Sequence, residues 1–175
     1  LVLAFVLDGC SSKNKEYDYY ISYVDSEQTR TVPFGYEPEN ASVDGLIQEL
    51  LDQLGTDTDT VDYVKAIPEG VSIQSWEVEQ DSLHLDFGSS YDKMDSITEI
   101  LCRLAVVKTM TQVEGIESVS FSVKGKPLQD SRGEVVGPMT ADSFVENPGE
   151  QINSYQNATI ELFFANESGD GLIKE

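Results

Sequence analysis

Two stretches with a helical spacing of apolar residues constrain the fold of this chain more than any other feature of its sequence. Between Ser42 and Gly55 the apolar residues recur three and four positions apart, at Val43, Leu46, Ile47, Leu50, Leu51 and Leu54. This spacing puts them on one face of an α-helix, which Ser42 begins as N-cap and Gly55 ends. A second such stretch covers about Asp95–Gln112 and carries a broader apolar stripe. Each helix therefore needs a partner surface that covers its apolar face.

Alternating apolar and polar residues predict short strands around these helices. They are expected at 19–24, at 31–34 (where Pro33 interrupts the pairing), at 71–78 with one break in the alternation, at 82–87, and at 116–123 before a hairpin turn at 124–126. Strands and helices do not alternate regularly along the chain. The sequence therefore predicts an α+β fold, with two amphipathic helices packed on one face of a mostly antiparallel sheet of about five strands.

The charge of the chain excludes one class of partner. Its 32 acidic and 11 basic residues give a net charge of −21, which repels nucleic-acid phosphates and anionic lipid headgroups. No nucleic-acid partner is expected, and attachment to a membrane would need a covalent anchor or a protein. The length of 175 residues, 39% of them hydrophobic, suits one globular domain with additional tail.

The first ten residues resemble the end of a bacterial lipoprotein signal. Leu1–Leu7 are all apolar, too few to span a bilayer, which takes about 20 residues, and typical of the apolar region of a secretory signal. Leu7-Asp8-Gly9-Cys10 then resembles a lipobox, in which the Cys sulfur receives diacylglycerol, although Asp8 replaces the usual small residue. We expect residues 1–9 to be a signal-peptide remnant, Cys10 to be the lipidation site, and residues 10–17 to form a lipidated tether.

The C-terminal residues repeat the pattern of the first hairpin. With an offset of 141 residues, Tyr19 aligns with Ile160, Tyr23 with Phe164 and Val32 with Ile173. The polar residues 147–158 precede this repeat and have no periodicity, which is typical of a linker. We therefore expect a domain at 18–146, a linker at 147–158, and at 159–175 the truncated start of a second copy.

The order of these segments resembles a known family, the GerM domain of sporulation and spore-germination lipoproteins. The resemblance is carried by YYISYVDSEQTRTVPF (19–34), SVDGLIQELLDQL (42–54), AIPEGVSIQSWEVEQDSLHLDF (66–87), EILCRLAVVKTMTQVEGIESVSFSVKGKPL (99–128) and VVGPMTADSF (135–144). The most specific parts are 67–70 and 113–127, and the acidic loop at 55–62 departs from the family pattern.

The resemblance has functional implications. It implies a GerM domain at 18–146 and the beginning of another at 159–175, because the family has tandem domains. It also implies a non-catalytic role in assembling protein complexes of the cell envelope, in sporulation or germination. The expected location is the outer face of the cytoplasmic membrane, anchored by the N-terminal lipid. The expected partners are envelope proteins or further copies of this chain, and no cofactor is implied.

The residues themselves do not form an enzyme motif. Ser82, His84 and Asp86 share one face of a predicted strand, but neighbours on one strand face project in parallel, whereas a catalytic triad must converge. The expected role of this face is a solvated surface, and a deep pocket around His84 would instead favour an envelope hydrolase. Cys102 is expected to pack as a small apolar residue. No catalytic residue is predicted.

Two acidic stretches are candidates for a cation-binding site. Asp52, Asp57, Asp59 and Asp62 are close in sequence, and Asn166–Ile173 matches part of a calcium-binding loop. Both are expected to be solvated segments, so no metal site is predicted.

The second candidate function is a module that binds cell-wall glycan or peptide. Its candidate contact residues are the aromatic side chains of Trp76, Tyr63 and Tyr91. Aromatic rings aligned on one face would favour this function, and a buried Trp76 would oppose it. The ligand-binding residues remain open at this point.

Overall fold

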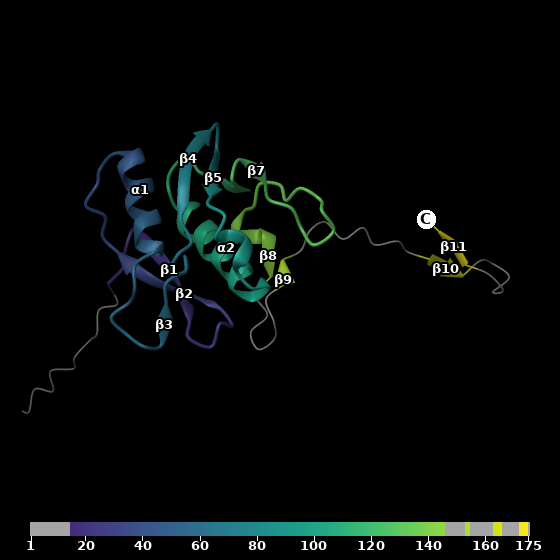
Figure 1. Ribbon diagram of the computed structural model, residues 1–175, viewed down its shortest axis with the longest axis horizontal. Coiled ribbons are helices and arrows are strands. Elements are labelled where there is room, and N and C mark those ends of the chain that lie inside the picture. The colour runs from purple at the N-terminus through teal and green to yellow at the C-terminus, as the bar shows by residue number, and fades with distance from the viewer. Residues whose placement is uncertain (1–14, 146–152, 155–162, 166–171, 175) are drawn as a thin grey trace, which may run out of the picture.

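The computed structural model describes residues 15–145, 153–154, 163–165 and 172–174 (Figure 1). Cys10, the signal-peptide remnant and most of the expected linker lie outside the described residues. Neither of the helices in the described part of the chain is long and apolar enough to cross a bilayer.

The first sheet is antiparallel and has the order β2-β1-β3. β1 is Tyr19–Asp25, β2 is Thr31–Tyr36 and β3 is Tyr63–Val64. β1 pairs with β2 along the whole of that strand, from Tyr19 opposite Tyr36 to Val24 opposite Thr31. β3 joins the other edge of β1 only at Val24 and Asp25. Two residues are too short for an alternating pattern, so β3 could not be recognised in the sequence.

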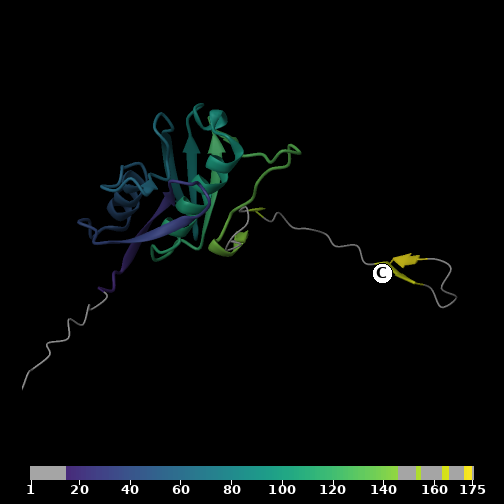
Figure 2. The same cartoon turned by 90° about the horizontal axis from the view of Figure 1, so that it is seen from below.

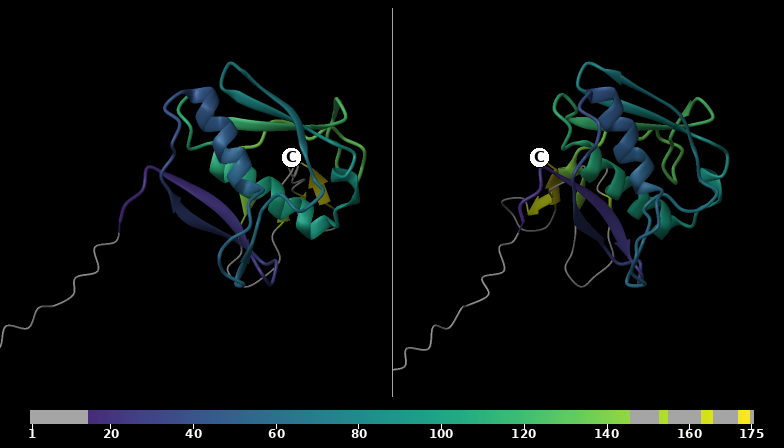
Figure 3. Two further views of the ribbon diagram at one scale, coloured as in Figure 1. Left: turned by 60° about the vertical axis from the view of Figure 1, so that its left-hand side comes forward. Right: turned by 90° about the vertical axis from the view of Figure 1, so that its left-hand side faces the viewer.

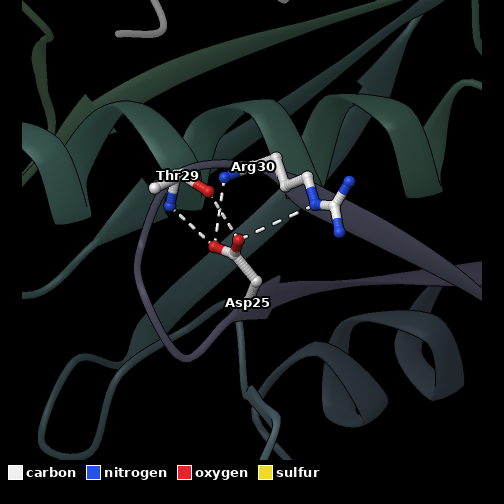
Figure 4. Close-up of polar contacts among 3 residues, drawn as sticks. All are labelled: Asp25, Thr29 and Arg30. Atoms are coloured by element: carbon white, nitrogen blue, oxygen red, sulfur yellow. Dashed lines mark hydrogen bonds and ion pairs between the residues drawn. The ribbon is translucent and has the colours of Figure 1, made fainter. Parts of the chain in front are cut away.

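Asp25 holds the turn between β1 and β2 (Figure 4). Its carboxylate accepts hydrogen bonds from the Thr29 backbone and hydroxyl and from the Arg30 N–H. The Arg30 Nε lies 3.7 Å from the same group. Burial acts to raise the pKa of Asp25, but the hydrogen bonds from Thr29 and Arg30 outweigh it and lower that pKa.

Pro33 does not interrupt the pairing of β2, contrary to the sequence prediction. Ser22, its partner on β1, donates its N–H to Thr109 Oγ1 at 3.1 Å instead of to β2. In an antiparallel ladder both members of such a pair turn their backbone groups outward. The missing N–H of Pro33 therefore falls on the outer edge, where a strand tolerates proline, and β2 continues to Tyr36.

The second sheet has the order β4-β5-β6-β7 (Figure 2). Its strands are Ile73–Glu79, Ser82–Phe87, Ser118–Val123 and Lys126–Pro127. β5 and β6 are parallel, and the other neighbours are antiparallel. The break in alternation that the sequence shows near Gln74 is an irregularity in the β4–β5 register between Ile73 and Ser75.

Both helices begin at the residues that the sequence indicates. In α1, Val43–Leu54, the Ser42 side chain accepts a hydrogen bond from the Gly45 N–H. In α2, Ser96–Met110, the Asp95 carboxylate accepts from the backbones of Ile97 and Thr98. Hydrogen bonds from Thr98, first from its hydroxyl, lower the pKa of Asp95. The caps satisfy backbone donors that have no partner inside a helix.

α2 lies at the centre of the core. It contacts β1 of the first sheet and β6 of the second, and α1 packs beside it and also contacts β1 (Figure 3). α1 buries the face that its spacing predicts, whereas α2 is buried on most sides. The largest completely buried side chains are Phe87, Ile21, Ile47, Leu50, Leu54, Leu83, Leu85, Leu101, Leu104, Met110, Val106 and Val107.

The segment after β7 covers the far edge of β6. Met139 and Val119 exchange backbone hydrogen bonds, both of 2.8 Å, and Leu128 donates to the Phe121 carbonyl at 3.0 Å. The pairs β8 (Phe144–Val145) with β9 (Asn153–Ser154) and β10 (Phe163–Ala165) with β11 (Leu172–Lys174) are antiparallel.

The predicted α+β class is confirmed, with two helices and mostly antiparallel strands. The difference lies in the arrangement of the strands, which form two sheets of three and four instead of one sheet of about five. α2, apolar around most of its circumference, needs a covering layer on more than one side, and the two sheets provide it.

Candidate interaction surface

The polar face of β5 pairs with that of β6. His84 Nδ1 lies 2.9 Å from Ser120 Oγ, and His84 Nε2 lies 3.0 Å from Ser122 Oγ. Ser122 Oγ in turn donates to the Asp86 carboxylate at 2.6 Å. The expectation of a solvated face is thus corrected, because His84 and Asp86 are half-buried and both contact the buried Ser122.

The direction and order of these hydrogen bonds decide whether the residues can act as a catalytic triad. Because Ser122 gives its proton to Asp86, it accepts from His84 Nε2, and in a neutral imidazole Nδ1 then accepts from Ser120. In a Ser-His-Asp triad the carboxylate bonds directly to the imidazole, whereas here Ser122 stands between them. Ser82 takes no part, since its Oγ is buried without a hydrogen-bond partner among the described residues. The three residues singled out in the sequence therefore do not converge as a triad.

Asp86 has a structural role at the end of the network. Its carboxylate also accepts the Gly125 N–H at 2.7 Å, which ties it to the β6–β7 turn. The Ser122 hydroxyl, then the Gly125 N–H, lower the pKa of Asp86. The ionised Asp86 carboxylate therefore connects β5 to the turn that follows β6.

Cys102 is buried in α2 as the sequence predicts, with 1% of its surface exposed. Burial raises the pKa of its thiol to about 12, so the thiolate that acts as a nucleophile is suppressed. The side chain packs in the hydrophobic core.

Sequence analysis missed a buried ion pair in α2. Arg103, 6% exposed, donates to Glu99 Oε2 at 2.7 Å, and its Nε lies 2.7 Å from Oε1 without the alignment of a hydrogen bond. Tyr91 donates to the same carboxylate at 2.7 Å. Burial, followed by the Glu99 charge, raises the pKa of Tyr91. The spacing of Glu99 and Arg103, four residues apart, was the available signal, but it does not show burial.

The three candidate aromatic residues do not share a surface. Tyr91 is in the core beside Phe87, and Tyr63, on β3, packs edge-to-face on Phe34 at 4.9 Å between centroids. Trp76 is half-buried on β4, and its indole N–H is held by Gln48 Oε1 at 2.9 Å. The aligned platform that would favour glycan binding is not formed by these residues.

A groove lies between α1 and β4. Its volume is about 420 Å³, and its lining includes Leu51 and Asp52 of α1, Ile67, and Ile73 and Trp76 of β4. Gln48 connects the two walls, since it accepts from Trp76 and donates to Asp52 at 2.9 Å. None of the lining residues is basic. We call this feature, together with the outer edge of β4, the edge groove.

The acidic residues of the loop before β3 do not gather into a site. Asp57 pairs with Lys65 at 3.2 Å. Within the described residues no group of three or more His, Cys, Asp or Glu side chains could hold a metal ion. Asn166–Gly171, most of the second acidic stretch, lies outside the described residues.

Comparisons with known proteins agree with this α+β architecture. The family model described as "Germane: Sporulation and spore germination" matches residues 19–129. The chain therefore belongs to this family, as its sequence segments indicated. No match is found among curated proteins.

Two solved structures from Bacillus subtilis have the same fold. The first GerMN domain of the sporulation protein GerM is 14% identical, with a TM-score of 0.54 over 70% of this chain and 95% of that one. The tandem GerMN domains of the same protein are also 14% identical, with a TM-score of 0.58 over 89% of this chain and 57% of that one. At this identity the likeness concerns the fold.

Proposed function

We propose that this chain is a non-catalytic module for protein–protein assembly in the cell envelope, acting in sporulation or spore germination. The observation that carries the proposal is the family match over residues 19–129, which associates the domain with these processes. The contacts of the polar side chains agree with a non-catalytic role. His84, Asp86 and Ser122 bond to one another across two strands, and Cys102 is enclosed in the core.

The proposal includes a lipid anchor on Cys10, which would hold the domain at the outer face of the cytoplasmic membrane. It is supported by the apolar run at 1–7 and by the lipobox-like residues 7–10. The domain surface offers little electrostatic attraction to anionic lipid, because the net charge is −21. Membrane attachment would therefore depend on Cys10. Replacing Cys10 with Ser should move the protein from the membrane fraction to the soluble fraction.

We further propose that residues 159–175 begin a second GerM domain. The support is a shared register: Val24 lies opposite Thr31 and Tyr23 opposite Val32, and 141 residues later Ala165 lies opposite Leu172 and Phe164 opposite Ile173. Deleting 159–175 should then leave the melting temperature of the first domain unchanged. A fall of several degrees would assign the hairpin to the first domain.

Cross-linking in sporulating cells tests the assembly function. The full chain, with a photoreactive residue on the domain surface, should form defined adducts with envelope proteins. A matched copy carrying the same residue at the buried position Leu104 should not. Absence of protein adducts from several surface positions, with the chain folded and membrane-bound, would contradict the proposed function.

A further inference from the structure

The outer edge of β4 is an unpaired strand edge in the described part of the fold. The Phe87 carbonyl accepts from Lys124, so Phe87 turns its backbone groups toward β6, and Leu85 and Leu83 do the same by alternation. The remaining β5 residues Ser82, His84 and Asp86 form the ladder with Glu79, Glu77 and Ser75. The N–H and C=O groups of Trp76 and Val78 consequently point away from the sheet.

The free edges of three other strands, β1, β2 and β6, are covered or blunted. Leu128 and Met139 bond to the outer edge of β6. On the outer edge of β2, Pro33 has no N–H to offer to a further strand. Gln112 and Thr109 bond to the free edge of β1. An uncovered edge is a template for another strand, and here β4 provides it.

The edge groove adds side-chain specificity to this edge. Trp76 and Val78 lie opposite the buried Leu85 and Leu83, so they face the apolar side of the sheet, yet Val78 is 40% exposed. A strand added to β4 would present alternate side chains to this side and place one in the groove between α1 and β4. Such a ligand needs an apolar residue at every second position.

The charge around the edge groove selects the other residues of the ligand. Glu77 and Glu79 are exposed on β4 and lie opposite His84 and Ser82, on the polar face of the sheet, and no residue lining the groove is basic. These carboxylates favour Lys or Arg at the positions between the apolar ones. A second copy of this chain, at a net charge of −21, would meet repulsion there instead.

We propose that β4 and the edge groove bind an extended segment of a partner protein in which apolar and basic residues alternate, and that this segment joins the four-stranded sheet beside β4. The inference rests on the proposed assembly function and specifies its surface and the chemistry of its partner.

The probe is a fluorescent nine-residue peptide of alternating valine and lysine, and binding to the full chain is followed by fluorescence anisotropy. The expected result is saturable binding that weakens as salt rises. A matched peptide of alternating valine and glutamate should bind at least ten-fold more weakly. Equal binding of the two peptides would overturn the proposed partner chemistry.

Two variants of one residue test the use of the backbone edge. Val78→Pro removes an outward N–H in the way that Pro33 does in β2, whereas Val78→Thr keeps the N–H and the branched shape. We expect Val78→Pro to weaken binding at least ten-fold and Val78→Thr to bind like the original chain. Equal affinities would overturn the proposal. If Val78→Pro does not fold, the valine–lysine peptide methylated at alternate backbone nitrogens supplies the same comparison, and undiminished binding would overturn it.

The remaining outcomes separate this inference from the proposed function. Glu77→Gln with Glu79→Gln should weaken binding of the valine–lysine peptide several-fold and reduce its salt dependence. Concentration-dependent self-association that Val78→Pro abolishes would show that a second copy occupies the edge, against our proposal. If cross-linking identifies an envelope partner that Val78→Pro still binds, the inference fails while the assembly function stands.

Discussion

Gln112 pairs with the backbone of Tyr20 as a neighbouring strand would. Its Oε1 accepts the Tyr20 N–H at 2.9 Å, and its Nε2 donates to the Tyr20 carbonyl at 2.8 Å. Gln112 lies just after the end of α2, and its side chain thus covers the part of the β1 edge that β3 does not pair with. Its second amide hydrogen bonds to the last turn of α2, where Nε2 donates to the Lys108 carbonyl at 2.9 Å.

Truncating Gln112 should therefore destabilise the domain. Gln112→Ala leaves the half-buried Tyr20 backbone without two partners, at an expected cost of about 1–2 kcal/mol in the free energy of unfolding. Gln129→Ala, at an exposed side chain, is the control and should change stability by less than about 0.5 kcal/mol. Urea unfolding monitored by circular dichroism measures both. Similar values for the two variants would mean that solvent replaces the Gln112 bonds.

Glu49 gives the loop before α1 a pH-dependent attachment. Its carboxylate accepts from the backbone of Glu39 at 2.8 Å, from Asn40, and from the Tyr36 hydroxyl at 2.7 Å. These hydrogen bonds, that from the Glu39 backbone first, lower the pKa of Glu49 from 4.5 to about 2. A carboxyl with a lowered pKa in the folded state stabilises the fold above its ordinary pKa. The stabilisation is lost as the pH falls from about 4.5 to about 2.

We thus expect Glu49→Gln to be less stable than the original chain at pH 7, and the difference to shrink as the pH falls below about 4.5. Urea unfolding at pH 7, 5 and 3 measures the difference. Glu77→Gln removes one exposed charge without affecting this loop and shows the effect of net charge alone. A difference between Glu49→Gln and the original chain that is constant with pH would contradict the assigned hydrogen bonds.

Local features of the fold were predictable because they depend on residues close in sequence. The spacing of Leu46, Ile47 and Leu50 fixes the buried face of α1, and Ser42 begins the helix as predicted. The hairpin after β6 follows from Lys124-Gly125. These elements are governed by helical period, caps and turn residues, which a single sequence displays directly.

Features that depend on strand order were not predictable in this way. The parallel pairing of β5 with β6 brings Ser120 and Ser122 to His84, although these residues are far apart in the sequence. No local pattern specifies which strands become neighbours, so the network and the free edge of β4 appear only in the folded chain. Trp76 could be named as a candidate, but its contact with Gln48 and its place in the groove could not.

The ion pair of α2 gives a third prediction. Arg103→Met leaves the Glu99 charge beside Tyr91 without its cation. Breaking a fully buried pair costs about 3–5 kcal/mol, and because the Glu99 side chain is 21% exposed we expect about 2–3 kcal/mol. The double variant Glu99→Gln with Arg103→Met should recover part of this loss, since no unpaired charge remains. Thermal and urea unfolding of both variants test the expectation. A double variant less stable than Arg103→Met would show that the charges are not the cause.

The β6–β7 turn allows one stabilising and one destabilising change at adjacent positions. Lys124 has φ +55° and Gly125 has φ +71°, so both residues of the two-residue turn are in the left-handed region. Asparagine tolerates this region better than lysine, and Lys124→Asn should stabilise the domain by about 0.5–1 kcal/mol.

Gly125→Ala should destabilise the domain by about 1 kcal/mol. This loss of stability would come from backbone strain at the positive φ angle and not from a clash, because an added Cβ meets no atom within 4 Å. The Gly125 N–H also donates to Asp86, so a distorted turn should weaken this hydrogen bond as well. Urea unfolding that shifts in the same direction for both variants would contradict the assigned turn.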